Sequence, residues 1–130
     1  MGISAEDSGR RLLKSEHGTY IRANAQTVDL KKGSPCDSEH WYIVDLGCKV
    51  SIKTFNSPER FLQAVPSGEV DLVEMDPNQC PAVMWQPSKN SDGTWSFLST
   101  YGTWLSGLGN GVVCCMPHWR SSEKFTLPWW

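Results

Sequence analysis

An internal repeat constrains this chain more than any other feature. Residues 13–23 and residues 97–107 both fit the pattern apolar-x-Ser-x-x-Gly-Thr-aromatic-apolar-x-small. A third copy lies over residues 52–64 and carries two extra residues in its turn, near Pro58. A unit of roughly 40 residues that recurs in this way indicates one supersecondary motif used several times.

The correspondence continues beyond this block. Each copy next has a Val that opens an apolar segment and, 13 to 15 residues later, an aromatic residue: Val28 and Trp41, Val70 and Trp85, Val112 and Phe125. Apolar and polar positions alternate at period two, which predicts short strands. Gly18 and Gly102 provide the positive φ that tight turns need. Four strands per copy predict twelve strands and no helix.

Two architectures share this period. Propeller blades also have four strands in about 40 residues, but closed propellers need at least about four blades. Three copies instead favour a β-trefoil, in which three units close a barrel with a hairpin cap. We therefore predict an all-β fold with one β-trefoil domain over residues 1–130, in three pseudo-symmetric repeats at about 10–46, 47–90 and 91–130.

The predicted core takes matching apolar positions from all three copies. Cys114 falls where Leu30 and Leu72 fall, so it is also expected to be a core position rather than a reactive thiol. The full set is Leu13, Ile21, Val28, Leu30, Trp41, Ile43, Ile52, Leu62, Val70, Leu72, Trp85, Phe97, Leu105, Val112, Phe125 and Leu127.

Composition bears on compartment and charge. Five cysteines, an odd count, and the absence of an apolar leader favour reduced thiols and a cytoplasmic protein. No run of 18 apolar residues is present, so we expect no membrane contact. Residues 1–35 carry six Lys and Arg against four Asp and Glu, and residues 36–90 carry four against eight. The first third is thus basic and the middle third acidic.

The repeat resembles that of the fascin family. The residues that carry the likeness are Leu13, Ser15, Gly18, Tyr20, Ile21 and Ala23 in the first copy, and Phe97, Ser99, Gly102, Trp104 and Leu105 in the third. The resemblance covers about residues 11–127 and implies a β-trefoil that binds actin filaments without catalysis. Hisactophilin, another trefoil of this kind, is rich in histidine. This chain has only three, so a histidine-driven pH switch is not expected.

A basic face on the first copy is the expected partner site. Its residues are Arg10, Arg11, Lys14, His17, Arg22, Lys31 and Lys32. Clustered positive charge attracts acidic partners, so actin filaments are the expected partner and a fascin-like cytoskeletal role the expected function. The alternative is a solvated polar face, because exposed strand positions alternate with core positions.

A carbohydrate-binding trefoil is the second hypothesis. Aromatic side chains stack on sugar rings or form protein contacts, and the candidates are Trp104, Trp119, Trp129 and Trp130. The Gln-x-Trp triplet of ricin-type lectins is absent. The alternative for the last two tryptophans is that residues 128–130 plug the open end of the barrel.

Other functions have weaker support. A protein-binding scaffold or inhibitor is a third hypothesis, with its contact in the insert 76–87. We expect no catalytic residues, no cofactor and no nucleic-acid partner, because no phosphate loop or nucleophile motif occurs and the net charge is −2. The pairs Cys36/His40 and Cys114/His118 lack the usual zinc spacing, so no metal is expected.

Overall fold

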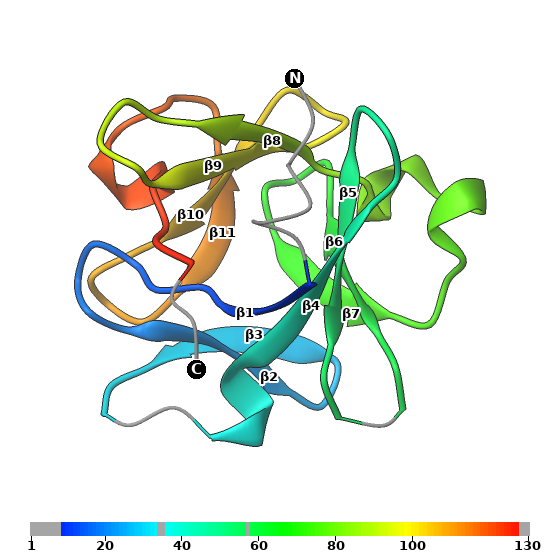
Figure 1. The fold of residues 1–130 in the computed structure, drawn as a ribbon, viewed down its shortest axis with the longest axis horizontal. Helices are drawn as coiled ribbons and strands as arrows, with labels where there is room; N and C mark the ends of the chain where they lie inside the picture. Colours follow the sequence, from blue (N-terminus) through cyan, green and yellow to red (C-terminus); the bar gives the residue numbers. More distant parts are fainter. Residues whose placement is uncertain (1–8, 34–35, 57, 128–130) are drawn as a thin grey trace.

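The computed structural model describes residues 9–33, 36–56 and 58–127 (Figure 1). Over these residues the fold is all β, with eleven strands, four short 3₁₀ helices and no α-helix. The strands are β1 (Gly9–Leu12), β2 (Tyr20–Asn24), β3 (Thr27–Lys31), β4 (His40–Asp45), β5 (Val50–Thr54), β6 (Phe61–Ala64), β7 (Val70–Val73), β8 (Gln86–Lys89), β9 (Trp95–Leu98), β10 (Trp104–Gly107) and β11 (Val113–Met116). The 3₁₀ helices are Asp37–Glu39, Pro77–Gln79, Pro81–Val83 and Ser121–Glu123.

The strands form two sheets that join into a closed ring. One sheet has the order β1-β4-β5-β6-β7-β3-β2 and the other has the order β11-β10-β9-β8. Isolated bridges connect them: Val50 with Trp85, Trp95 with Phe125, and Lys14 with Thr126. The ring therefore passes through β1, β4, β5, β8, β9 and residues 125–126, then returns to β1. Closure of this kind removes the free strand edges that invite aggregation.

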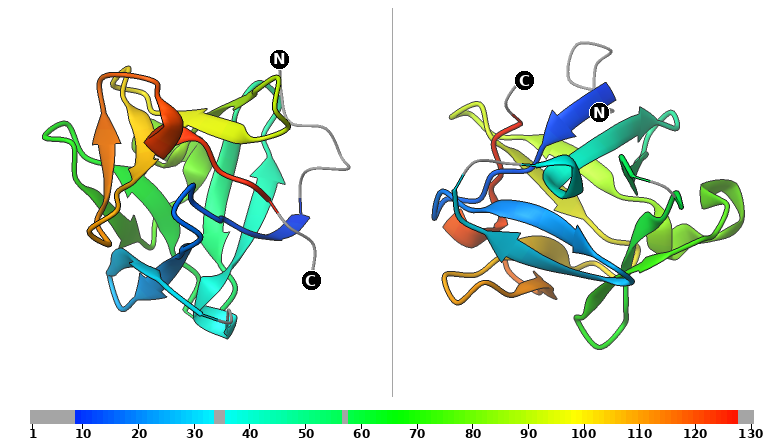
Figure 2. Two further views of the ribbon diagram at one scale, coloured as in Figure 1. Left: turned by 90° about the vertical axis from the view of Figure 1, so that its left-hand side faces the viewer. Right: turned by 90° about the horizontal axis from the view of Figure 1, so that it is seen from below.

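Three hairpins cover one end of this ring (Figures 1 and 2). They are β2–β3, β6–β7 and β10–β11, one from each sequence copy. Isolated bridges tie the hairpins to one another: Thr27 with Asp71, Asp29 with Val112, and Glu69 with Cys114. Each copy thus supplies strands to the ring and one hairpin to this cap.

The copies match in atomic detail as well as in pattern. Trp41 and Trp85 are both fully buried. The indole nitrogen of Trp41 donates to the carbonyl oxygen of Ile21 at 2.9 Å, and that of Trp85 donates to the carbonyl oxygen of Leu62 at 3.0 Å. Each buried indole N–H therefore has a hydrogen-bond acceptor in the second strand of its own copy, and buried donors in proteins generally have such a partner.

The expected core is confirmed at most positions and wrong at two, Val112 and Cys114. Val112 is 46% exposed, and Val113, at 6%, is buried in its place. The cause is the length of the turn before this strand. Gly107 pairs with Val113 as Ala64 pairs with Val70, whereas Ala23 pairs with Val28 across a loop one residue shorter, so Val113 rather than Val112 is the counterpart of buried Val70. The same shift turns Cys115 rather than the residue before it into the core.

The expected twelfth strand is reduced to two bridges among the described residues. Phe125 pairs with Trp95 and Thr126 pairs with Lys14, so consecutive residues bond to different neighbours and no longer ladder forms. Within the described part of the chain, no helix combines the length and apolar character needed to cross a membrane.

Candidate functional site

The structure does not gather the predicted basic residues into one positive surface. Arg11 is only 2% exposed. Arg22 makes a two-pronged ion pair with Asp29 at 2.8 and 2.7 Å, and the Lys31 ammonium lies 3.6 Å from the carboxylate of Glu39. The Asp29 pair also raises the pKa of Arg22. Burial and pairing thus remove three of the seven charges from an outward-facing patch.

The other members of the predicted face lie in different surroundings. The Arg10 guanidinium stacks 4.0 Å from the centre of the Phe55 ring and donates to Nδ1 of His40 at 3.0 Å. The Lys14 ammonium lies 5.9 Å from the Tyr20 ring centre. His17 has a carboxylate oxygen 3.8 Å away, from Glu16, and Lys32 is exposed.

The tryptophans proposed for sugar contacts occupy distinct places. Trp104 begins β10 and is half-buried. Trp119 is 49% exposed, donates its indole hydrogen to Ser96 Oγ at 2.9 Å and has the Lys124 ammonium 5.2 Å from its ring centre. Trp129 and Trp130, together with the proposed plug, lie outside the described residues.

A small hollow, here called the lateral pocket, lies beside Trp104. It has a volume of about 250 Å³ and is lined by Gln86, Pro87, Ser88, Lys89, Trp95, Leu98 and Trp104. Strand register brings these residues together. Gln86 pairs with Leu98, and Leu98 pairs with Trp104 across the next strand. Because directly paired residues project from the same face of a sheet, these three side chains lie side by side.

The chemistry of the lateral pocket combines indole rings with exposed polar groups. Trp95 is 5% exposed and Trp104 is half-buried. Gln86, Ser88 and Lys89 are exposed, and the Lys89 ammonium lies 5.7 Å from the ring centre of Trp95. A hollow with an apolar wall and a few polar groups is the usual form of a small-molecule site.

Sequence reasoning named Trp104 as a sugar contact, and it placed Gln86 and Pro87 in the insert of the protein-binding hypothesis. The β8 residues belong to the preceding copy and were not connected with Trp104. The repeat register could have connected them, since the last strand of one copy precedes the first strand of the next.

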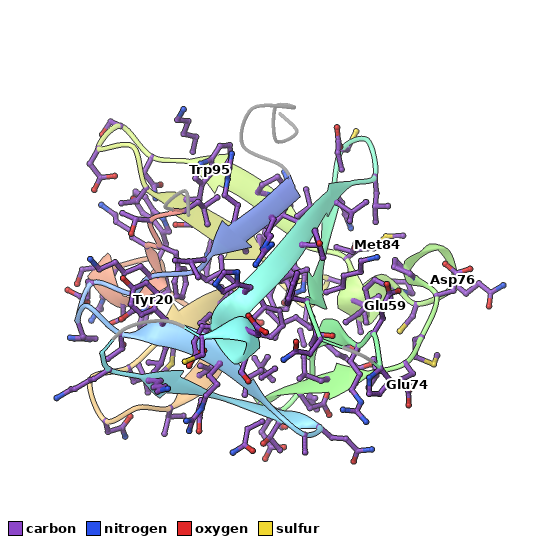
Figure 3. The ribbon with its side chains drawn as sticks, turned by 60° about the horizontal axis from the view of Figure 1, so that its bottom comes forward. Tyr20, Glu59, Glu74, Asp76, Met84 and Trp95 are labelled. Atoms are coloured by element: carbon purple, nitrogen blue, oxygen red, sulfur yellow. The ribbon has the colours of Figure 1, made fainter. Side chains whose placement is uncertain are left out.

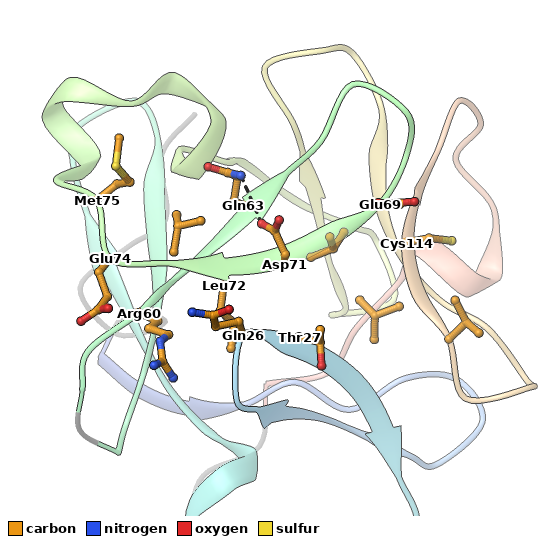
Figure 4. A pocket seen from close by; sticks show the side chains of 14 residues that line it. Gln26, Thr27, Arg60, Gln63, Glu69, Asp71, Leu72, Glu74, Met75 and Cys114 are labelled. Atoms are coloured by element: carbon orange, nitrogen blue, oxygen red, sulfur yellow. Dashed lines mark hydrogen bonds between the residues drawn. The ribbon is translucent and has the colours of Figure 1, made fainter.

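A larger hollow, here called the cap groove, crosses the hairpins (Figure 4). It has a volume of about 770 Å³ and lies along β7, with residues from the starts of β3 and β11 opposite. Its polar lining residues are Gln26, Thr27, Arg60, Gln63, Glu69, Asp71 and Glu74. No aromatic ring is present among the described residues that line it.

The polar groups of the cap groove are partly engaged with one another. Gln63 Nε2 donates to Asp71 Oδ1 at 3.1 Å, and Arg60 donates to the carbonyl oxygen of Ala25 at 3.1 Å. Burial raises the pKa of the Asp71 carboxyl, the hydrogen bond from Gln63 opposes this, and the charge of Glu69 adds to it. The groove is therefore acidic and rich in hydrogen-bond acceptors.

Two further features named in the sequence are possible metal ligands and the insert 76–87, whose last residues, Gln86 and Pro87, line the lateral pocket. In the described part of the chain, no group of three His, Cys, Asp or Glu side chains could hold a metal ion. His118 Nδ1 lies 2.9 Å from Glu123 Oε1. The insert forms two 3₁₀ turns, and Val83 from the second is fully buried, which anchors it to the body of the protein.

Comparison with known proteins gives one informative result. No family model matches the sequence, and no curated protein matches it. Among solved structures, the chain is similar to "SeviL bound to asialo-GM1 saccharide", with a TM-score of 0.79 over 92% of this chain and 96% of that one. The sequence identity is 19%, so the likeness is one of fold.

This result corrects the functional expectation. The fascin-like, actin-binding prediction is wrong, because the similar structure is a lectin with a bound glycan. Nothing found connects the chain with fascin or hisactophilin in particular. The burial of Arg11 and the ion pairs of Arg22 and Lys31 agree with this correction, since they remove much of the charge that was to attract actin.

Proposed function

We propose that this protein is a non-catalytic carbohydrate-binding β-trefoil that holds a sugar in the lateral pocket. The observation that carries the proposal is the likeness of fold, over nearly the whole chain, to a lectin in complex with a saccharide. The trefoil assignment is supported by the closed ring, the three-hairpin cap and the matching Trp41 and Trp85 hydrogen bonds.

Pyranose rings have one apolar face of C–H groups and a rim of hydroxyls. The lateral pocket has the complementary features. The half-buried indole of Trp104 offers a flat apolar surface, and the amide of Gln86, the hydroxyl of Ser88 and the ammonium of Lys89 can bond to hydroxyls. A stacked sugar would therefore lie against Trp104 with its hydroxyls toward β8.

The cap groove is the competing location on the same molecule. It offers more volume and more acceptors, but it lacks the ring on which a sugar stacks. Its polar groups are also partly engaged, as in the contact between Gln63 and Asp71. We therefore place the saccharide in the lateral pocket.

A glycan array probed with the full chain, followed by isothermal titration of each hit, tests the function. Trp104→Ala should weaken binding about tenfold or more, because truncating a central aromatic contact removes much of the binding energy. Tyr101→Ala is the matched control, since Tyr101 is 46% exposed and lines neither hollow. No binding to any glycan would overturn the proposed function. Binding that Trp104→Ala leaves intact would move the site.

A further inference from the structure

We infer that the lateral pocket selects acidic saccharides, in which a carboxylate or sulfate lies at Lys89 while a sugar ring stacks on Trp104. This inference rests on the proposed function and adds a ligand class to it. It is carried by the charges around the pocket, by the position of the Lys89 ammonium and by the separation of the pocket from the acidic part of the molecule.

The charge of the lateral pocket is of one sign. Among the described residues that line it, Lys89 alone has an ionised side chain and none has a carboxylate. The cap groove is the opposite case, because Glu69, Asp71 and Glu74 face it with a single arginine. A sugar carboxylate or sulfate in the lateral pocket would meet a cation and no competing anion.

Lys89 differs from several other lysines in its pairing. Lys53 and Lys124 each have a carboxylate oxygen within 3.6 Å. Over the described residues, Lys89 has no such ion pair, and its ammonium instead lies 5.7 Å from the Trp95 ring centre. The indole excludes water from one side of the ammonium, which lowers the local dielectric constant there and strengthens the interaction with an incoming anion.

The acidic segment of the chain lies elsewhere. Figure 3 shows Trp95 on one side of the molecule and the carboxylates of Glu74 and Asp76 on the other. Separations beyond about 8–10 Å are largely screened at physiological ionic strength. Glu74 and Asp76 therefore do little to cancel the local field of Lys89.

Two saccharides that differ by one charged sugar provide the test. The first is the asialo-GM1 saccharide, and the second is the same saccharide carrying its sialic acid. A sulfated galactose derivative distinguishes a sulfate from a carboxylate as the preferred anion. Isothermal titration of the full chain is carried out at about 0.01 M and about 0.15 M ionic strength, because salt screens exposed charge pairs.

We expect the sialylated saccharide to bind about fivefold to tenfold more tightly at low salt, with a smaller difference at the higher salt. Lys89→Gln should bring the ratio of the two affinities to about one, and this ratio is the readout because Lys89 also borders the neutral sugar. Lys32→Gln is the matched control, since it deletes one positive charge at an exposed site that lines neither hollow.

The outcomes separate the inference from the function on which it rests. Equal affinity for both saccharides, unchanged by Lys89→Gln, would overturn the inference and leave carbohydrate binding in place. If the preference for the sialylated saccharide remained in Lys89→Gln or in Trp104→Ala, the inference would also be overturned, because the anion would then bind outside the lateral pocket. Binding to no saccharide of either kind, on the array or in titration, would overturn both proposals.

Discussion

The lateral pocket and the cap groove are two hollows on one barrel with opposite chemistry. The first is small, has two indole rings and carries one lysine. The second is about three times larger and carries carboxylates, amides and aliphatic side chains without a ring. Volume alone would select the groove. The difference shows that the surface offered for stacking, rather than the size of the hollow, decides where a sugar is expected to bind.

The three copies differ in the residues at the position of the lateral pocket. In every copy an aromatic residue begins the second strand, and it pairs with a residue on or directly after the first strand. These pairs are Tyr20 with Lys14, Phe61 with Lys53, and Trp104 with Leu98. In the first two copies the partner is a lysine whose ammonium lies over an aromatic ring, that of Tyr20 or Tyr42. Only Trp104 has an apolar partner there.

The largest difference in glycan affinity between the two hollows should come from variants that fill each hollow with an indole ring. Ser88→Trp places an indole in a hollow of about 250 Å³, so glycan affinity should fall about 100-fold or more. Val112→Trp fills the cap groove from an exposed position and should leave affinity unchanged. Titration measures both affinities, and thermal unfolding confirms that both variants fold. The reverse ranking would transfer the site to the groove.

A smaller effect should follow from removing one amide in each hollow. Gln86→Ala deletes a side chain that can bond a sugar hydroxyl, so affinity should fall about fivefold, the equivalent of one hydrogen bond of about 1 kcal/mol. Gln63→Ala removes the donor to Asp71 in the cap groove and should not change affinity. Equal losses in the two variants, measured by titration, would show that the two hollows act together.

Stability should reveal the electrostatic character of the cap groove. Burial raises the folded-state pKa of Asp71 above 3.8, so the stability that its protonated form contributes is lost as pH rises through the folded pKa. Asp71→Asn should therefore stabilise the protein at neutral pH, by less than about 1 kcal/mol, and this gain should vanish below the ordinary carboxyl pKa. Urea unfolding at several pH values measures this. A destabilised variant at neutral pH would contradict the sign.

The smallest effect concerns the pH dependence of binding. No histidine, aspartate or glutamate lines the lateral pocket, so affinity for a neutral glycan should change by less than about twofold between about pH 5 and pH 8. For a site in the cap groove, glycan affinity would change as the pH falls, because the raised pKa of Asp71 means that it takes up a proton more readily than an ordinary carboxyl. A marked fall in affinity at the acid end would therefore favour the groove.

The sequence repeat predicted much of the fold but little of the candidate site. The pattern located buried Trp41 and Trp85, because a core position must be apolar in every copy. The pattern misplaced Val112, because the turn of the third copy has one residue more than that of the first copy. Such a difference of one residue moves a strand residue to the opposite face of the sheet. The basic face failed for another reason: sequence spacing does not show that Arg11 is buried or that Arg22 meets Asp29 across a hairpin. The lateral pocket needed residues from two copies.

The place where the ring closes has a dynamic consequence. Trp95 and Phe125 exchange two backbone hydrogen bonds, at 2.7 and 2.8 Å, and Trp95 also lines the lateral pocket. The bridge between Lys14 and Thr126 and the fully buried side chain of Phe125 also hold the last described segment to the barrel, so the ring opens here only when Phe125 leaves the core. A ligand packed against Trp95 binds only the closed form. Occupancy should therefore slow amide exchange at Phe125 and raise the unfolding temperature, with a gain that grows with the logarithm of ligand concentration above the Kd.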